Sequence, residues 1–126
     1  MTFSIEAKAR NLSMSATKVR LVLGIVRGKP VDEALALLKF TTNAAAKPTR
    51  KLIASAAANA EENFGLMRDE LFVAEIQAGP GRTRRKGRFG ARGRFKPELS
   101  RSCHISVALR EISPEPIEGL AEDAEA

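Results

Sequence analysis

The chain of 126 residues has no tryptophan, no tyrosine, one histidine and one cysteine. With so few side chains of these types, no pair of nucleophile and general base can be assigned. Cys103 beside His104 also has no companions at the spacing of a zinc site. A single cysteine also excludes a disulfide within the chain, so we interpret Cys103 as a thiol of the core. We therefore predict no catalytic residue, no metal, no cofactor and no enzymatic activity.

Long hydrophobic runs are also missing. No apolar stretch approaches the roughly 18 residues of a membrane-spanning helix, and the amino terminus lacks the charged-then-apolar pattern of a secretion signal. No phosphate-binding loop or dinucleotide fingerprint occurs. We expect an intracellular protein with no membrane span and no small-molecule substrate.

The most informative stretch that is present is residues 79–101, GPGRTRRKGRFGARGRFKPELSR. One acid, Glu98, stands in it against nine basic residues: Arg82, Arg84, Arg85, Lys86, Arg88, Arg92, Arg94, Lys96 and Arg101. A stretch this charged and this rich in glycine cannot be buried in the protein's own core, so it is predicted to bind a polyanion. Most of these residues are arginines, whose planar guanidinium suits phosphates and bases better than solubility requires.

The two flanks of this stretch predict its shape. LFVAEIQAG before it and SCHISVAL after it are typical of strands, and the second alternates with four apolar residues on one side: Cys103, Ile105, Val107 and Leu109. We predict an extended β-hairpin that projects from the domain, with Gly87, Gly90 and Gly93 near its turn. The alternative is an Arg/Gly loop that stays disordered without a partner.

The rest of the chain predicts the domain that bears the hairpin. Residues 2–9 alternate as a first strand. Helices are expected from Ala16 to Arg27 after a Ser15 cap, from Pro30 to about Thr41, and after an Asn43 cap. The expected inward faces are Val19, Val22, Leu23 and Val26 in the first helix and Ala45, Leu52, Ala56, Ala60 and Phe64 in the third. This pattern predicts an α+β fold, in which a three-stranded sheet packs on three helices.

Charge and composition also divide the chain. Residues 1–112 are expected to form a single domain that includes the hairpin at 79–101. Residues 113–126 are acidic, contain two prolines and no basic residue, and are predicted to be a disordered tail. A second basic patch is predicted on the domain, with an ordinary solvated helix face as the alternative, and consists of Lys8, Arg10, Lys18, Arg20, Arg27 and Lys29.

Several separate blocks of the sequence resemble one known family. They include AKARNLSMSATKVRLVLGIVRGKPVDEALALLKF, KLIASAAANAEENFGL, the strand that enters Gly79-Pro80, ARGR at 91–94, and SCHISV at 102–107. In this order they resemble universal large-subunit ribosomal protein twenty-two in its bacterial form, over residues 5–112. The resemblance implies a small α+β domain with three helices on a three-stranded sheet.

The resemblance also implies a function and partners. It implies a structural constituent of the large ribosomal subunit that binds ribosomal RNA, assists assembly, contacts neighbouring ribosomal proteins and meets the nascent peptide at the wall of the exit tunnel. The implied location is a cytoplasmic ribosome, with an organelle ribosome as the alternative. RNA contacts carry over to Lys18, Arg20, Arg27, Lys29, Arg92, Arg94, Arg101 and His104, and the tunnel-lining tip carries over to Lys86, Gly87, Arg88, Phe89, Gly90, Ala91 and Arg92.

The sequence departs from the family pattern in a longer hairpin loop, in its acidic tail and in two substitutions. Ala16 stands where members have a proline after the cap serine, and KGRFGARGR stands where they have a proline and a bulky apolar residue near the tip. By the residues alone, the main alternative function is an architectural DNA-binding protein with a basic β-arm. Such proteins are usually dimers, whereas the apolar stripes of this chain are accounted for by one layer of helices on one sheet.

Overall fold

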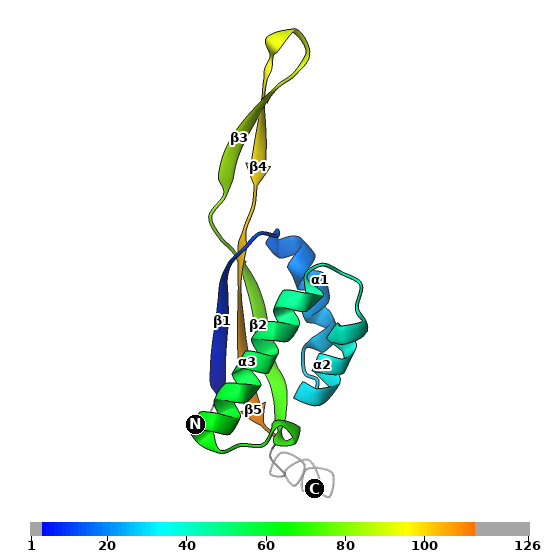
Figure 1. The fold of residues 1–126 in the computed structure, drawn as a ribbon, viewed down its shortest axis with the longest axis vertical. Coiled ribbons are helices and arrows are strands. Elements are labelled where there is room, and N and C mark those ends of the chain that lie inside the picture. Colours follow the sequence, from blue (N-terminus) through cyan, green and yellow to red (C-terminus); the bar gives the residue numbers. More distant parts are fainter. Residues whose placement is uncertain (1–3, 113–126) are drawn as a thin grey trace, which may run out of the picture.

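The fold is that of a computed structural model, which describes residues 4–112 of the chain. The elements, coloured along the chain in Figure 1, are β1 (Ile5–Leu12), α1 (Ala16–Val26), α2 (Val31–Phe40), α3 (Ala46–Phe64), β2 (Leu71–Pro80), β3 (Arg84–Phe89), β4 (Phe95–Ser100) and β5 (Cys103–Glu111), with short 3₁₀ turns at Arg68–Glu70 and Ala91–Gly93. The predicted acidic tail at 113–126 lies outside the described residues.

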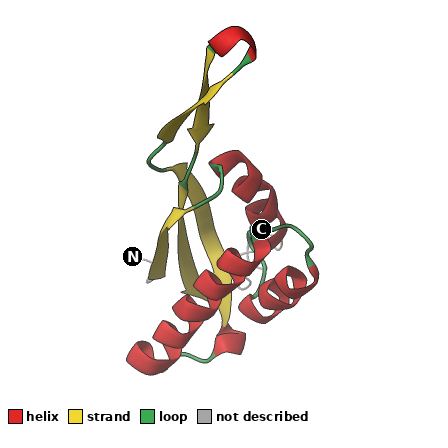
Figure 2. Cartoon of the chain, turned by 45° about the horizontal axis from the view of Figure 1, so that its top comes forward, coloured by secondary structure: helices red, strands yellow, loops and turns green. Residues whose placement is uncertain are grey.

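The three-stranded sheet has the order β1-β5-β2 and is antiparallel throughout. The three helices cover one of its faces, as Figures 1 and 2 show, so the other face is open. β5 is the central strand and alternates as predicted, because its core-facing residues Cys103, Ile105, Val107 and Leu109 are all buried. The predicted combination of three helices with a three-stranded sheet is confirmed.

The predicted end of the first strand is wrong. β1 runs from Ile5 to Leu12, whereas the prediction ended at residue 9, and residues 2 and 3 of that prediction lie outside the described residues. The alternation that suggested an earlier end is broken at Asn11, which has a positive φ of 58° at a register shift between Ala9 and Leu12. The chain absorbs this irregularity and then pairs Leu12 with Cys103, so the strand continues past the point where its pattern fails.

The helices pack largely as their spacing predicts. The predicted face of α1 is buried, and Gly28 follows the helix with a φ of 79°, a left-handed conformation that favours glycine. α3 approaches the sheet closely through Ala56, Ala57 and Ala60, none of which is exposed. The prediction for Phe64 is wrong, because its position at the last turn of α3, before the left-handed Gly65, leaves it 49% exposed.

α1 and the loop after it cover the edge of the sheet that β2 forms. The loop after α1 pairs with β2 through two backbone hydrogen bonds, from Gly28 N to Val73 O (2.9 Å) and from Val73 N to Lys29 O (2.9 Å). Further along the same edge, Arg27 donates to the carbonyl of Ile76 at 2.8 Å, and Arg20 donates to the carbonyl of Ala78 at 3.2 Å from Nε and 3.0 Å from Nη2. These contacts satisfy backbone groups that an edge strand otherwise leaves available to another chain.

We predict that Arg20→Ala and Arg27→Ala each lower the free energy of unfolding by about 1 kcal/mol, because each leaves a partly buried carbonyl without its charged donor. Lys18→Ala is the control, since this exposed residue of α1 should change stability by less than about 0.5 kcal/mol. Chemical denaturation followed by circular dichroism measures both effects. Equal stabilities for all three variants would contradict a role for the two arginines in closing the edge.

Cys103 generates a second prediction. Its side chain is fully buried, and burial raises the pKa of the thiol above its ordinary value. Because less thiolate is present at pH 8, we expect iodoacetamide to alkylate the native protein roughly tenfold or more slowly than the unfolded chain. The raised pKa also makes stability depend on pH. The free energy of unfolding should fall as the pH rises above the ordinary thiol pKa of about 8.5, because the thiol then ionises more readily in the unfolded chain than in the folded one. Equal alkylation rates in the folded and unfolded states would contradict this assignment.

Candidate nucleic-acid interface

The basic stretch lies on a pair of strands that leaves the body of the protein. β2 and β5 pair up to Pro80 and Cys103, and beyond them Gly81 N donates to Ser102 O at 2.8 Å. β3 and β4 then pair as a separate two-stranded antiparallel sheet, which Figure 1 shows extending away from the helices. We call residues 82–101 the arm.

The turn of the arm lies further along the chain than expected. The ladder continues to the pair Phe89–Phe95, and residues 90–94 reverse the chain, closed by a hydrogen bond from Gly90 N to Arg94 O at 2.6 Å. Arg92 and Gly93 both have positive φ, 57° and 71°, and make the reversal. The first four residues predicted to line the tip, Lys86 to Phe89, are therefore part of strand β3, and Gly87 lies opposite Pro97 rather than near the turn.

Most of the charge on the arm is not neutralised by the protein. All nine basic side chains are exposed. Only Arg88 makes an ion pair within the described residues, to Glu98 at 2.8 Å, and the other eight cations have no carboxylate partner there. A pair this exposed contributes little to stability. The arm is therefore a narrow strip of positive potential with almost no compensating acid.

The register of the ladder gives the arm two different faces. Paired residues project to the same side, so one side, which we call the charged face, consists of Arg84, Lys86, Arg88, Lys96, Glu98 and Ser100. The opposite side, which we call the apolar face, consists of Arg85, Gly87, Phe89, Phe95, Pro97 and Leu99. Counting charges along the sequence missed this division, although the alternation in FKPELS contains it.

Two further groups of predicted residues are brought together where the arm joins the body. A hollow of about 350 Å³ contains Arg82, Arg84 and Arg101 together with four small polar residues: Asn11, Ser13, Ser100 and Ser102. On the open face of the sheet, a hollow of about 440 Å³ is lined by Lys8, Arg10 and His104. These cations continue the positive strip of the arm onto the body.

His104 has a definite hydrogen-bonding state in this arrangement. It is partly buried, and its Nδ1 accepts a hydrogen bond from the backbone N–H of Asn11 at 3.0 Å. Since Nδ1 accepts, the proton of the neutral ring lies on Nε2. The residue therefore tethers the irregular end of β1, and its Nε2 lies beside Gly81, where the arm leaves the body.

The predicted basic patch on α1 is divided by the structure. Lys18 is exposed, but Arg20 and Arg27 donate to carbonyls of β2, and Lys29 lies 3.8 Å from the carboxylate of Glu33. Sequence patterns also missed Lys47 and Lys51, which flank an apolar hollow of about 650 Å³ between β1 and the start of α3. The sequence predicts a helix for these two lysines but gives no signal that β1 lies beside them.

Within residues 4–112, no group of three or more histidine, cysteine, aspartate or glutamate residues is arranged to hold a metal ion. None of the helices in this part of the chain is both long and apolar enough to cross a membrane.

Comparison with known proteins agrees with this arrangement. Residues 7–110 match the family model described as ribosomal protein L22p/L17e. The chain is also 45% identical over 111 residues to the large ribosomal subunit protein uL22 of Synechococcus sp. (strain JA-3-3Ab), a match that covers 88% of this chain and 90% of that protein. The chain therefore belongs to the ribosomal protein L22p/L17e family.

Proposed function

We propose that the protein binds large-subunit ribosomal RNA through its arm and the adjoining cations of the body. Membership of the family makes it a structural protein of the large ribosomal subunit, located in the cytoplasmic ribosome. The predicted structural role is therefore confirmed, and so is the prediction that the protein is not an enzyme. The observation that supports RNA binding most strongly is the set of eight cations on the arm that have no carboxylate partner among the described residues. Mutual repulsion disfavours such an array unless a polyanion neutralises it.

The shape of the arm favours an extended contact within folded RNA. A two-stranded ribbon has no core of its own and is marginally stable in water, so it gains order when its two faces are covered. Structured ribosomal RNA supplies phosphates and unpaired bases on several sides of such a projection. The alternative of an architectural DNA-binding protein has no support from the family.

We further propose that the arm assists assembly and that its turn contributes to the wall of the peptide exit tunnel, where it meets the nascent peptide. These roles are carried over from the resemblance. In this chain the turn consists of residues 90–94, so Gly90, Ala91 and Arg92 are the predicted tip residues that lie at the end of the arm. Lys86 and Arg88 lie on the charged face and are better placed to contact RNA.

RNA binding through the arm predicts a specific dependence on salt. The triple substitution Arg84→Ala, Arg85→Ala and Lys86→Ala should flatten the dependence of log K on log salt by about two to three units, since each lost phosphate contact removes roughly 0.7 to 0.9. Filter binding to a large-subunit RNA fragment measures this slope. The matched control removes the same charge from the helical side, through Lys39→Ala, Arg50→Ala and Arg68→Ala, and should leave the slope nearly unchanged. An unaltered slope for the arm variant would contradict the proposal.

A second prediction separates the arm from the body. Replacing residues 82–101 by Asn-Gly should leave a folded protein, because Gly81 and Ser102 already face each other and a two-residue turn suits such a pair. We expect the shortened protein to keep its cooperative thermal unfolding. It should co-sediment less with assembling large subunits in a sucrose gradient, and ribosomes that contain it should respond differently to stalling peptides.

Normal assembly and an unchanged stalling response would contradict the roles assigned to the arm. Failure of the shortened protein to fold would instead contradict the prediction that the body folds without the arm.

A further inference from the structure

The apolar face of the arm has no partner within the described part of the protein. Phe89 is 81% exposed, Phe95 is 62% exposed and Leu99 is 46% exposed. The phenylalanines are the directly opposed pair that ends the ladder, and their ring centroids lie 6.4 Å apart with the planes at 75°. The proposed contact with phosphates accounts for the charged face, but it does not account for two exposed aromatic rings on the other side.

The position of Phe95 depends on a glycine across the ladder. A Cβ added to Gly87 would overlap the outer ring atoms Cε2 and Cζ of Phe95, so the ring lies across the backbone of β3 at this residue. One side of the ring therefore contacts the strand and the other is open. Phe89 stands nearly at right angles beside it. The open side of the Phe95 ring and the Phe89 ring beside it together form one exposed apolar surface.

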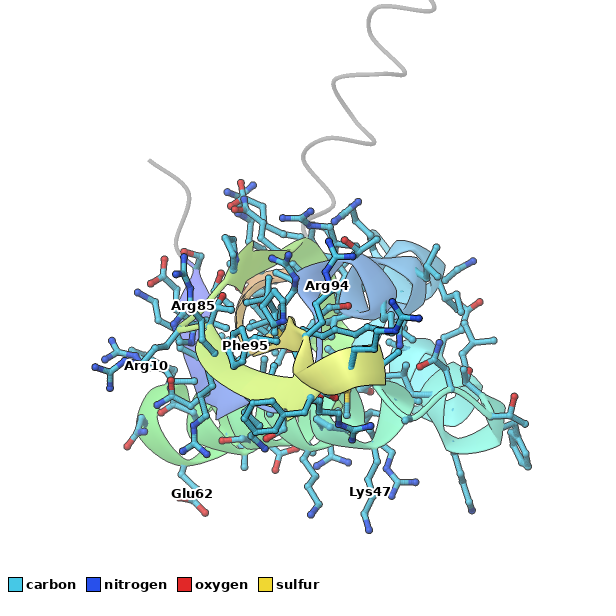
Figure 3. All side chains as sticks on the ribbon, turned by 90° about the horizontal axis from the view of Figure 1, so that it is seen from above. Arg10, Lys47, Glu62, Arg85, Arg94 and Phe95 are labelled. Atoms are coloured by element: carbon cyan, nitrogen blue, oxygen red, sulfur yellow. The ribbon has the colours of Figure 1, made fainter. Side chains whose placement is uncertain are left out.

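We propose that this surface is a stacking site for an unpaired nucleobase of RNA, a ligand that nothing in the charge pattern specifies. The proposal rests on the RNA-binding function proposed above. Exposed aromatic rings stack on bases without regard to sequence, and neighbouring arginines bind the adjoining phosphates. Arg85 belongs to the same face, and Arg94 precedes Phe95 in the chain. Figure 3 looks down on the arm and shows Arg85, Arg94 and Phe95 around the strands of the arm, whereas Lys47 and Glu62 lie on the α3 side.

Charge distinguishes this occupant from a protein surface. A protein that covered the apolar face would have to lie among unpaired cations and would need a matching set of acids. RNA carries its negative charge on every nucleotide and offers an apolar base beside each phosphate. Each phenylalanine of the arm directly follows an arginine in the chain, at 88–89 and 94–95, so a base and the phosphate beside it can be bound together.

The experiment compares one RNA strand in two states. The probes are a fluorescein-labelled oligoadenylate of about twelve nucleotides and the same strand annealed to oligouridylate, in which the bases are stacked and paired. Binding of the full-length protein is measured by fluorescence anisotropy over a range of salt concentrations. We expect the double variant Phe89→Leu and Phe95→Leu to bind the single strand roughly tenfold more weakly and the duplex less than twofold more weakly, with an unchanged salt slope.

Two further variants make the result specific. Gly87→Ala keeps both rings and every charge but displaces the ring of Phe95, so it should reproduce part of the loss for the single strand alone. Arg84→Ala with Lys86→Ala, on the charged face, should weaken both probes and flatten the salt slope. Thermal unfolding of each variant should match that of the wild type, because none of these side chains belongs to the buried core.

The outcomes separate the two proposals. If the wild type binds both probes with the expected salt dependence but the phenylalanine and glycine variants bind as it does, the stacking site is wrong and the RNA-binding function stands. An equal loss on both probes also overturns stacking, because it would mean that the rings support the shape of the ribbon. If the wild type binds neither probe nor the ribosomal RNA fragment, the RNA-binding function itself is wrong.

Discussion

The pairing of β2 with β5 is the interaction on which the rest of the structure depends. It buries Val73 and Ile76 from one strand beside Ile105 and Val107 from the other, so it is the centre of the core. The same two strands are the only covalent connections to the arm. Because the ladder fixes the separation and direction of Pro80 and Cys103, a stable body sets the direction in which the arm leaves. Core mutations that weaken this ladder would therefore alter the direction of the arm, and with it the proposed RNA binding, without touching a cation.

The cations of this protein serve two physical purposes, and their partners distinguish them. Arg20 and Arg27 donate to carbonyls of β2 and hold α1 against the edge of the sheet. Among residues 4–112, most cations of the arm have no carboxylate partner, and the single glutamate of the arm is paired with Arg88. The role of a positively charged residue in this protein is thus known only once its hydrogen-bond partners are known.

Sequence patterns predicted the elements of the body well, because its side chains obey simple periods. The buried stripe of α1 and the alternation of β5 both follow from burial on one side. The predictions failed where local backbone geometry overrides the period. Asn11 interrupts β1 without ending it, and Phe64 lies at the last turn of α3, where the helix no longer covers the core.

The composition of the sequence predicted where the site lies, but its geometry depends on how β3 and β4 pair, which composition does not show. Glycines at 87, 90 and 93 look equivalent in the sequence, yet only Gly93 has a positive φ, whereas Gly87 leaves room for the ring of Phe95. A change of register by one residue would put Phe89 and Phe95 on opposite sides of the ribbon and abolish the apolar surface. Two-stranded ribbons are only marginally stable by themselves, so the division of the arm into two faces depends on the register that β3 and β4 adopt. In this register both phenylalanines lie on the side away from Arg84, Lys86 and Arg88, which is the arrangement that the proposed stacking site requires.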